Sequence, residues 1–206
     1  MISICPKCHN HDWDKEVKKE DKTVICCPKC RHEWSSKGLP LFILSGCSGV
    51  GKTTTAMELL QRKTNFIVLD ADYFQFMPSD TLEDWAAHIE RQEEISADIM
   101  QCGLPVLWAM AGCLDRLHST YHERFFSGIH CLALTCETEE LHRRMTEGRN
   151  ITSEQWIQSS IEYNQYFREH DTIGDIKFSC FDTTNKSTKE IADYVIQWVN
   201  SYMEES

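Results

Sequence analysis

The stretch with the clearest chemistry is GCSGVGKT, which spans residues 46–53. It fits the pattern GxxxxGK[ST], in which glycines let the backbone curl so that successive N–H groups point at phosphate oxygens. Lys52 adds a positive charge for the β- and γ-phosphates, and the Thr53 hydroxyl is placed to ligate Mg²⁺. The pattern therefore predicts a site for nucleotide phosphates made by Gly46, Cys47, Ser48, Gly49, Val50, Gly51, Lys52, Thr53 and Thr54.

Four cysteines near the start of the chain have the spacing of a metal site. Cys5 and Cys8 bound one Cys-Pro-Lys-Cys knuckle, and Cys27 and Cys30 bound another, with 18 residues between the two. This is the spacing of zinc sites, and four thiolates leave tetrahedral Zn²⁺ no open position, as in a structural site. We therefore expect a zinc ribbon over residues 1–37, with its folding energy supplied by the metal.

The role of the ribbon is open at this level. Trp13 and Trp34 follow the two knuckles at similar offsets and are expected to give the ribbon a small apolar surface. That surface could dock to a partner, dock to the rest of the chain, or serve only as a stability cap.

The elements that must position the phosphate-binding residues alternate between strand and helix patterns. Short apolar runs predict strands at 41–45, 66–69, 105–110, 129–135 and 176–181. Helices are predicted near 52–63, 81–102, 114–126, 138–146, 153–169 and 188–202, the last opened by a capping box at 187–190. The predicted fold class is α/β: a doubly wound five-stranded parallel sheet with helices on both faces and the nucleotide at the carboxyl ends of its strands.

Composition and charge limit the function classes. Hydrophobic residues make up 41% of the 206-residue chain, enough for a core, and no apolar run reaches the ~18 residues that a membrane span needs. We see no signal peptide and expect a cytoplasmic protein whose 11 cysteines are not a disulfide framework. The net charge is +2 over residues 1–37 and −13 over the remainder, which argues against broad nucleic-acid binding.

Over residues 41–202 the chain resembles the small P-loop kinases of the adenylate kinase, shikimate kinase and chloramphenicol phosphotransferase group, and uncharacterised bacterial nucleoside or nucleotide kinase-like proteins. The resemblance rests on the P-loop, on Val68-Leu69-Asp70-Ala71-Asp72 after the second strand, and on the arginine-bearing segment 141–149. It implies an ATP- and Mg²⁺-dependent kinase with a P-loop NTPase fold over residues 41–206. Within that domain it implies an acceptor region at about 70–103 and a lid at about 141–170.

The resemblance also implies which acidic residues serve catalysis beside Lys52. Asp70 and Asp72 fall where such kinases carry an acid that activates the acceptor hydroxyl or supports Mg²⁺. Asp70 is assigned to Mg²⁺ together with Thr53, and which aspartate is the base stays open. The ordinary alternative is a helix cap or a plain strand-end aspartate.

Arginines of the predicted lid are the third catalytic group. Arg143, Arg144 and Arg149 resemble lid arginines that neutralise charge on the transferring phosphoryl group, and Arg149 is the first choice. An exposed helix face is the ordinary alternative for each. The aromatic residues of the lid are expected to be packing residues: Trp156, Tyr163, Tyr166 and Phe167.

The acceptor region offers aromatic residues and one arginine. For Tyr73, Phe74, Phe76 and Trp85 we favour the core over contact with the acceptor, and for Arg91 we favour an ion pair on a helix surface.

Two missing acids narrow the class of P-loop protein. The third strand ends without an aspartate, which counts against a motor or AAA-type ATPase. Thr188 replaces the aspartate in Asn185-Lys186-Ser187-Thr188, which disfavours a regulatory GTPase.

The leading function is a kinase acting on a small hydroxyl- or phosphate-bearing acceptor, with a nucleoside or nucleotide as the favoured class. One alternative is a polynucleotide 5′-hydroxyl kinase whose ribbon binds nucleic acid through Lys15, Lys18, Lys19 and Lys22. The other is a nucleotide-dependent switch that presents the ribbon to a protein partner. No motif names the acceptor or the oligomeric state.

Overall fold

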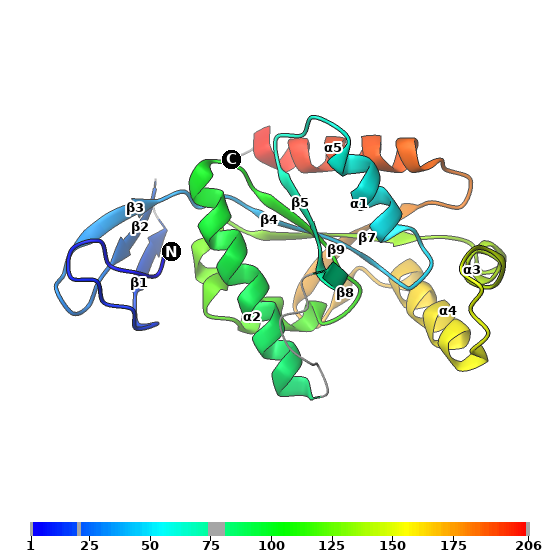
Figure 1. The fold of residues 1–206 in the computed structure, drawn as a ribbon, viewed down its shortest axis with the longest axis horizontal. Helices are drawn as coiled ribbons and strands as arrows, with labels where there is room; N and C mark the ends of the chain where they lie inside the picture. Colours follow the sequence, from blue (N-terminus) through cyan, green and yellow to red (C-terminus); the bar gives the residue numbers. More distant parts are fainter. Residues whose placement is uncertain (1, 20–21, 74–80, 205–206) are drawn as a thin grey trace.

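The computed structural model describes residues 2–19, 22–73 and 81–204. Two sheets organise them (Figure 1). The smaller is an antiparallel sheet of β1 (Glu16–Lys19), β2 (Thr23–Cys26) and β3 (Glu33–Ser36). The larger has the strand order β5-β6-β4-β7-β9-β8. No helix among the described residues is long and apolar enough to cross a membrane.

The larger sheet is the predicted parallel sheet with one short strand added. Its parallel strands are β4 (Leu41–Gly46), β5 (Ile67–Asp70), β6 (Val106–Ala109), β7 (Ile129–Thr135) and β9 (Ile176–Asp182). The antiparallel edge strand β8 (Thr172–Ile173) was not expected. The chain runs from β4 out to β5, returns through β6, and continues on the other side of β4 with β7. This reversal at β4 is the topological switch point beside which α/β proteins bind ligands.

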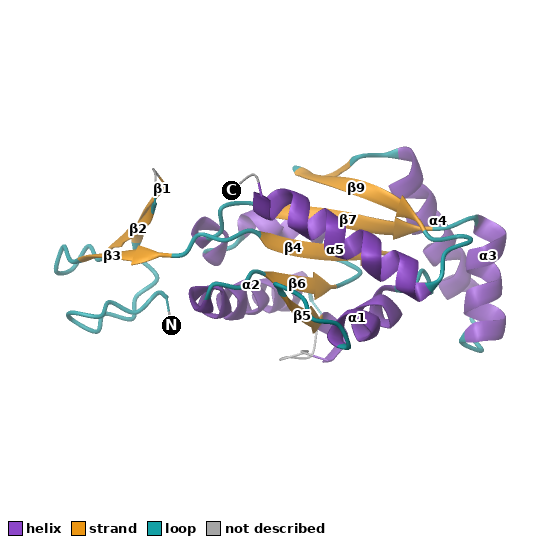
Figure 2. Ribbon diagram, turned by 90° about the horizontal axis from the view of Figure 1, so that it is seen from above, coloured by secondary structure: helices purple, strands orange, loops and turns teal. Residues whose placement is uncertain are grey.

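Helices cover both faces of this sheet, as expected. In Figures 1 and 2, α1 (Lys52–Leu60) and α5 (Thr188–Glu204) lie on one face and α2 (Leu82–Ile99) lies on the other. Strand β4 is buried throughout: Phe42 and Leu44 pack in the core with α1 and α5, while Leu41 and Ile43 pack in the core with α2. The P-loop therefore begins at the end of a strand that is fixed from both sides.

Two predicted helices are wrong in type or extent. The segment 114–126 is not an α-helix but two 3₁₀ helices, Leu114–Ser119 and His122–Phe125, which flank an extended Thr120. Leu114 and Leu117 are both buried, and a spacing of three residues suits the three residues per turn of a 3₁₀ helix. The helix predicted at 138–146 is α3 (Thr138–Arg143) followed by a π-helical turn, Arg144–Gly148.

The N-terminal sheet packs against the body of the chain at the amino ends of the parallel strands (Figure 1). Ile2 and Ile25 are buried in the core cluster that contains Leu41 and Trp108. Trp13 stacks on Tyr121 with ring centroids 5.3 Å apart. Both tryptophans contact the body: Trp13 lies on Tyr121 but stays 52% exposed, and Trp34 packs against the same core cluster.

Candidate functional site

The P-loop has a backbone that only glycine adopts without strain. Gly46 has φ +132°, and a Cβ there would lie 2.4 Å from the carbonyl oxygen of Leu134. Gly51, with φ +112°, precedes α1 without a side-chain cap, and the first turn of α1 carries no acidic residue. The first N–H groups of α1 therefore stay available to an anion, as phosphate binding requires.

Lys52 folds back over its own loop. Its Nζ donates to the carbonyl oxygens of Gly46 and Cys47 at 2.8 and 2.9 Å. Burial lowers the pKa of Lys52 below its usual value, against the opposing fields of the Cys47 thiol, Asp72 and Asp70. The lysine is thus already placed at the mouth of the loop that would hold the phosphates.

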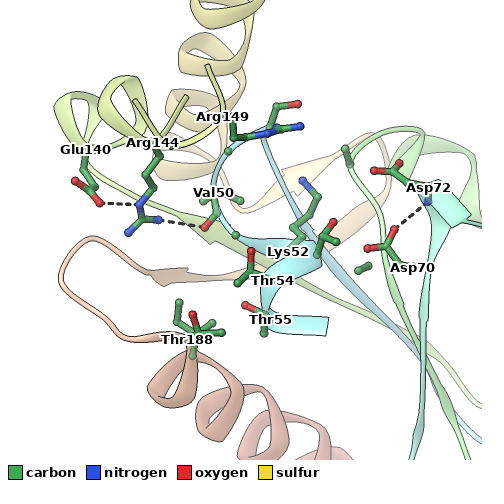
Figure 3. A pocket seen from close by; sticks show the side chains of 18 of the residues that line it. Val50, Lys52, Thr54, Thr55, Asp70, Asp72, Glu140, Arg144, Arg149 and Thr188 are labelled. Carbon is green, nitrogen blue, oxygen red and sulfur yellow. Dashed lines mark hydrogen bonds and ion pairs between the residues drawn. The ribbon is translucent and has the colours of Figure 1, made fainter. Parts of the chain in front are cut away.

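Asp70 and Asp72 face this loop from the end of β5 (Figure 3). One Asp70 oxygen, Oδ1, accepts a hydrogen bond of 3.0 Å from the backbone N–H of Asp72. The other, Oδ2, is buried and has no hydrogen-bond partner among the described residues. A buried carboxylate oxygen without a partner is costly unless a cation or donor completes it, so these residues fit the expected Mg²⁺ with Thr53.

A pocket of about 980 Å³ joins the predicted parts of the site. All six predicted catalytic residues line it, and so does the P-loop from Ser48 to Thr54, whereas Gly46 and Cys47 do not. The pocket also contains residues that sequence reasoning did not assign to the site: Glu140, Trp156, Lys186 and Thr188.

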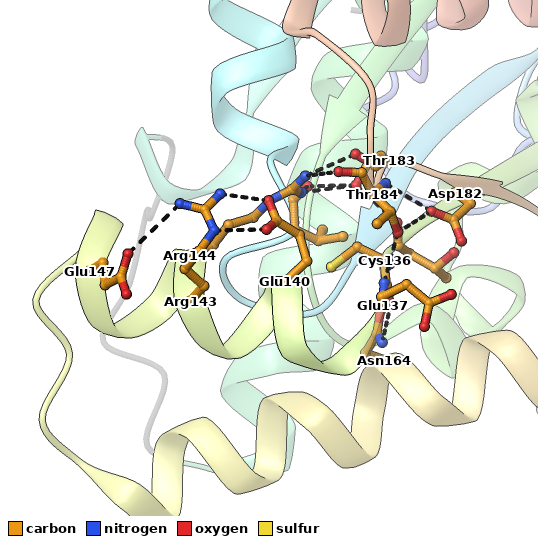
Figure 4. Close-up of polar contacts among 12 residues, drawn as sticks. Cys136, Glu137, Glu140, Arg143, Arg144, Glu147, Asn164, Asp182, Thr183 and Thr184 are labelled. Carbon is orange, nitrogen blue, oxygen red and sulfur yellow. Dashed lines mark hydrogen bonds and ion pairs between the residues drawn. The ribbon is translucent and has the colours of Figure 1, made fainter.

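The three lid arginines play different parts. Arg144 donates to the carbonyl oxygen of Val50 at 3.2 Å and to that of Thr183 at 2.8 Å, so it ties the P-loop to the loop after β9 (Figures 3 and 4). Arg143 is bound to Glu140, and the Arg143 guanidinium, aided by Arg144, holds the pKa of Glu140 at about 2. Arg143 and Arg144 are therefore already neutralised in the free protein.

Arg149 is different from both. It is exposed, forms no ion pair among the described residues, and its guanidinium lies 5.5 Å from the centre of the Trp156 ring. It follows the π-helical turn Arg144–Gly148, a type of turn that is frequent at functional sites. Of the three arginines it is the one with a charge to offer to a ligand.

The segment predicted as a lid is anchored to the sheet at its base. Helix α4 (Glu154–Glu169) carries the buried Asn164, whose side chain bonds both the N–H and the carbonyl of Cys136 at the end of β7, at 3.1 and 2.8 Å (Figure 4). The expectation that lid aromatics pack holds for Phe167, which is buried, and for Tyr163 and Tyr166, which pack against the core, but not for Trp156, which is 44% exposed. Trp156 lies about 20° from Phe167 around the helix, at the edge of the buried stripe, so the helical pattern did not mark it as exposed.

Of the described residues in the predicted acceptor region, about 70–103, only Asp70 and Asp72 line the pocket. Phe74 and Phe76 lie outside the described residues, as does the side chain of Tyr73. Trp85 meets His88 edge-on, and Arg91 pairs with Glu94 on the helix surface, as expected for Arg91. Neither Trp85 nor Arg91 lines the pocket.

The four ribbon cysteines come together. Their sulfur atoms all lie within 4.8 Å of one another, with Cys5 and Cys30 at 3.6 Å and Cys8 and Cys27 at 3.7 Å. A tetrahedral zinc with bonds of about 2.3 Å separates its sulfurs by about 3.8 Å. The donor set therefore fits Zn²⁺, and the neighbouring Cys26 stands outside the group.

The four ribbon lysines considered for nucleic-acid binding differ: Lys19 and Lys22 are exposed, whereas the other two are engaged within the chain. Lys15 is fully buried, and its Nζ donates to the carbonyl oxygen of Asp12 at 2.6 Å and to Asp14 at 2.8 Å. Lys18 pairs with Glu33 at 2.8 Å. Two of the lysines considered for a nucleic-acid grip are therefore already engaged.

The chain belongs to the AAA domain family, whose model matches residues 43–167. The match does not test the expectation, drawn from the third strand, that the chain is not a motor or AAA-type ATPase, which stays a prediction. The strand itself is as expected, since β6 ends in Trp108-Ala109 without an acid. A search of curated protein sequences gave no match.

The fold is similar to those of solved kinases. It is similar to a sugar kinase from Janibacter sp. HTCC2649, with TM-score 0.59 and 16% identity over 79% of this chain and 95% of that one. It is similar to a gluconokinase from Sinorhizobium meliloti 1021, with TM-score 0.59 and 14% identity over 82% and 96%. It is also similar to the Mycobacterium tuberculosis APS kinase solved with AMPPNP and APS, with TM-score 0.51 and 15% identity over 80% and 99%. The predicted P-loop kinase fold is confirmed.

Proposed function

We propose that this protein is an ATP- and Mg²⁺-dependent kinase that phosphorylates a small acceptor, with a nucleoside or nucleotide as the acceptor class. The observation that carries the proposal is that one pocket contains both an acidic and a basic group that lack ionic partners among the described residues. The buried Oδ2 of Asp70 and the unpaired guanidinium of Arg149 both flank the P-loop. A phosphoryl group with its metal ion supplies the partner that each of them lacks.

In the proposed reaction an acceptor oxygen attacks the γ-phosphorus, and the bond to the bridging oxygen breaks so that ADP leaves. The P-loop N–H groups and Lys52 hold the β- and γ-phosphates. Asp70 or Asp72 accepts the proton of the acceptor hydroxyl, and Arg149 neutralises charge on the transferred group. Mg²⁺, held by Thr53 and Asp70, would stabilise the charge that develops on the phosphates.

The acceptor is the finer part of the proposal. The structural neighbours are named for a sugar, for gluconate and for APS. The nucleoside class comes from the resemblance of the P-loop, the aspartate pair and the lid arginines to small nucleoside and nucleotide kinases. The neighbours' acceptors are therefore the competitors that an assay must include.

The test is a panel of nucleosides, nucleotides, sugars, gluconate, antibiotics and APS with Mg·ATP, scored by ADP release and by phosphorylated product. We expect one class to be phosphorylated, Lys52→Ala to abolish that transfer, and Asp70→Asn to lower turnover by about 10²–10⁴-fold while Mg·ATP still binds. Normal turnover by Asp70→Asn would remove the role given to that carboxylate. Phosphorylation of sugars or gluconate alone would support the kinase activity but contradict the nucleoside or nucleotide acceptor class.

We also propose that residues 1–37 form a structural zinc ribbon and residues 41–206 the kinase domain. All 11 cysteines are free thiols, which suits a reducing compartment such as the cytoplasm. The ribbon lies at the amino ends of the strands and the P-loop lies at their carboxyl ends (Figure 1). Strand β4, which leads from the ribbon linker to the P-loop, has six residues and so spans about 20 Å.

This separation bears on the two alternative functions. A nucleic acid held by the ribbon would have to reach about 20 Å along the domain, the length of β4, before its 5′ end met Asp70. A switch that presents the ribbon to a partner would have to release Ile2 and Ile25 from the core. Oligonucleotide binding that falls steeply with salt would favour the first alternative over the small-molecule kinase.

A further inference from the structure

A tryptophan bridges the P-loop and the lid. Trp156 lies in the first turn of α4, and its indole N–H donates to Oγ of Ser48 in the P-loop at 3.3 Å. The Arg149 guanidinium lies over the same indole ring, 5.5 Å from its centre. Ser48, Arg149 and Trp156 all line the pocket that contains Lys52. One side chain thus contacts both the loop for the phosphates and the free arginine of the lid.

The local sequence fixes Trp156 without burying it. Ser153 caps α4 by accepting a hydrogen bond from the backbone N–H of Trp156 at 3.3 Å, and the next residue, Ile157, enters the core. The indole itself stays 44% exposed. A large aromatic ring that is held in place yet left in solvent contributes little to the core, so its contacts in the pocket need another explanation.

Lys52 and Arg149 line one pocket, together with Arg143, Arg144 and Lys186. Burial is the main cause that lowers the pKa of Lys52, and the positive charge of Arg149 adds to it. Like charges that share a pocket repel, so a contact that holds Arg149 near the P-loop prepares the site before the phosphates arrive. A guanidinium over the face of an indole is such a contact, because the ring quadrupole attracts the cation.

We propose that Trp156 is a positioning residue that holds Arg149 ready for the γ-phosphate, with its own ring held by the hydrogen bond to Ser48. The inference rests on the proposed kinase function and adds a residue to it that the sequence assigned to packing. A nucleoside triphosphate should bind more tightly because of this arrangement, since its γ-phosphate meets a prepositioned arginine. A diphosphate has no γ-phosphate and gains nothing.

The test compares the calorimetric affinities of the full chain for Mg·AMPPNP and Mg·ADP. Arg149→Met should weaken AMPPNP binding about tenfold and leave ADP unchanged. Trp156→Leu should weaken AMPPNP binding about two- to fivefold, also without affecting ADP. Trp156→Phe keeps an aromatic face and loses the N–H donor, so its loss should be smaller. In the Arg149→Met background, Trp156→Leu should cause no further loss.

Gln158 provides a matched control on the same helix. It is exposed and bonds only Glu162 among the described residues, so Gln158→Leu should change neither affinity. A merely structural role for Trp156 would weaken both nucleotides alike, or add to the loss in the Arg149→Met background, and would overturn the proposal. Unchanged AMPPNP affinity in Trp156→Leu would overturn it too. A wild-type chain that binds neither nucleotide would instead contradict the proposed function, and the positioning role with it.

Discussion

The two ends of the parallel sheet treat charge in opposite ways. At the carboxyl end, the pocket keeps the Asp70 oxygen and the Arg149 guanidinium without ionic partners among the described residues. At the amino end, where the ribbon docks, the buried Lys15 is enclosed by oxygens of Asn10, Asp12 and Asp14. Glu90 accepts from the backbone N–H groups of Tyr121 and His122 beneath the ribbon.

The difference separates a site from a structural contact. A buried polar group without a partner among the described residues destabilises the fold, as do Glu93 Oε1 and His122 Nε2 toward the ribbon, but Asp70 belongs to an open pocket where a ligand can complete it. A charged group whose hydrogen bonds are all made within its own chain has none left for a ligand, so it stabilises the fold instead. We therefore expect substitutions at the ribbon end to change stability, and substitutions at the P-loop end to change activity.

Removal of the metal is expected to have the largest effect on stability at the ribbon end. Chelation of zinc, or Cys27→Ser, should unfold the ribbon and withdraw Ile2 and Ile25 from the core, which costs about 3–6 kcal/mol of the free energy of unfolding at about 1.5–3 per side chain. Urea denaturation with and without chelator measures it. An unchanged midpoint would mean that the ribbon is an independent module, as the switch alternative needs.

Two lysines give a matched comparison of the two ends. Lys52→Met should abolish at least 99% of phosphoryl transfer, because it removes the cation at the phosphates, and should leave the free energy of unfolding within about 1 kcal/mol. Lys15→Met should do the reverse, with a loss of about 2–3 kcal/mol because it leaves the oxygens around it unpaired. Urea denaturation measures the stability of both variants, and ADP release measures their phosphoryl transfer. A stable Lys15→Met with low activity would make the ribbon part of the site.

The buried acid on α2 makes stability depend on pH. Glu93 is buried, and burial, with smaller contributions from Glu90 and Glu123, raises its pKa to about 9 against the effect of a hydrogen bond from Thr120. In the unfolded chain its pKa is near 4.3, so folding binds a proton between these values. The contribution of Glu93 to the free energy of unfolding should therefore be largest below about pH 4 and fall by up to about 1.4 kcal/mol per pH unit between about pH 4 and pH 9.

Glu93→Gln removes this dependence, since the amide does not titrate. Its free energy of unfolding, measured at pH 5, 7 and 9, should fall less steeply with pH than that of the wild type. Equal slopes in the two proteins would show that Glu93 is ionised in the folded state.

The sequence predicted the parts of this molecule that are set by local patterns. The five parallel strands were found from their short apolar runs, and the capping box of α5 forms as expected, with Ser187 donating to Glu190 at 2.8 Å. The cysteine spacing brought the four sulfurs together. In each of these cases neighbours in sequence, or a fixed spacing, determine the structure.

Features that depend on distant contacts were missed. The segment 114–126 became two 3₁₀ helices because its buried leucines meet the face of the sheet covered by α2. Lys15 reads as a surface cation, but it is buried, and its backbone N–H donates to the hydroxyl of Tyr121, 106 residues away. Trp156 reads as a packing residue, but its partner Ser48 lies 108 residues away. No local pattern encodes such a pairing.

The smallest expected effect is a difference in the free energy of unfolding between variants of two neighbouring arginines within the site. Arg144→Met should cost about 1–2 kcal/mol of the free energy of unfolding and weaken Mg·ATP binding, because its guanidinium ties Val50 of the P-loop to Thr183. Arg143→Met should cost less than about 0.5 kcal/mol, because the Arg143 side chain is 56% exposed and its ion pair with Glu140 is screened by solvent. Urea denaturation and nucleotide titration measure both. If Arg143→Met lowers turnover as much as Arg149→Met does, Arg143 leaves Glu140 during the reaction, and the lid supplies two arginines to the phosphoryl group instead of one.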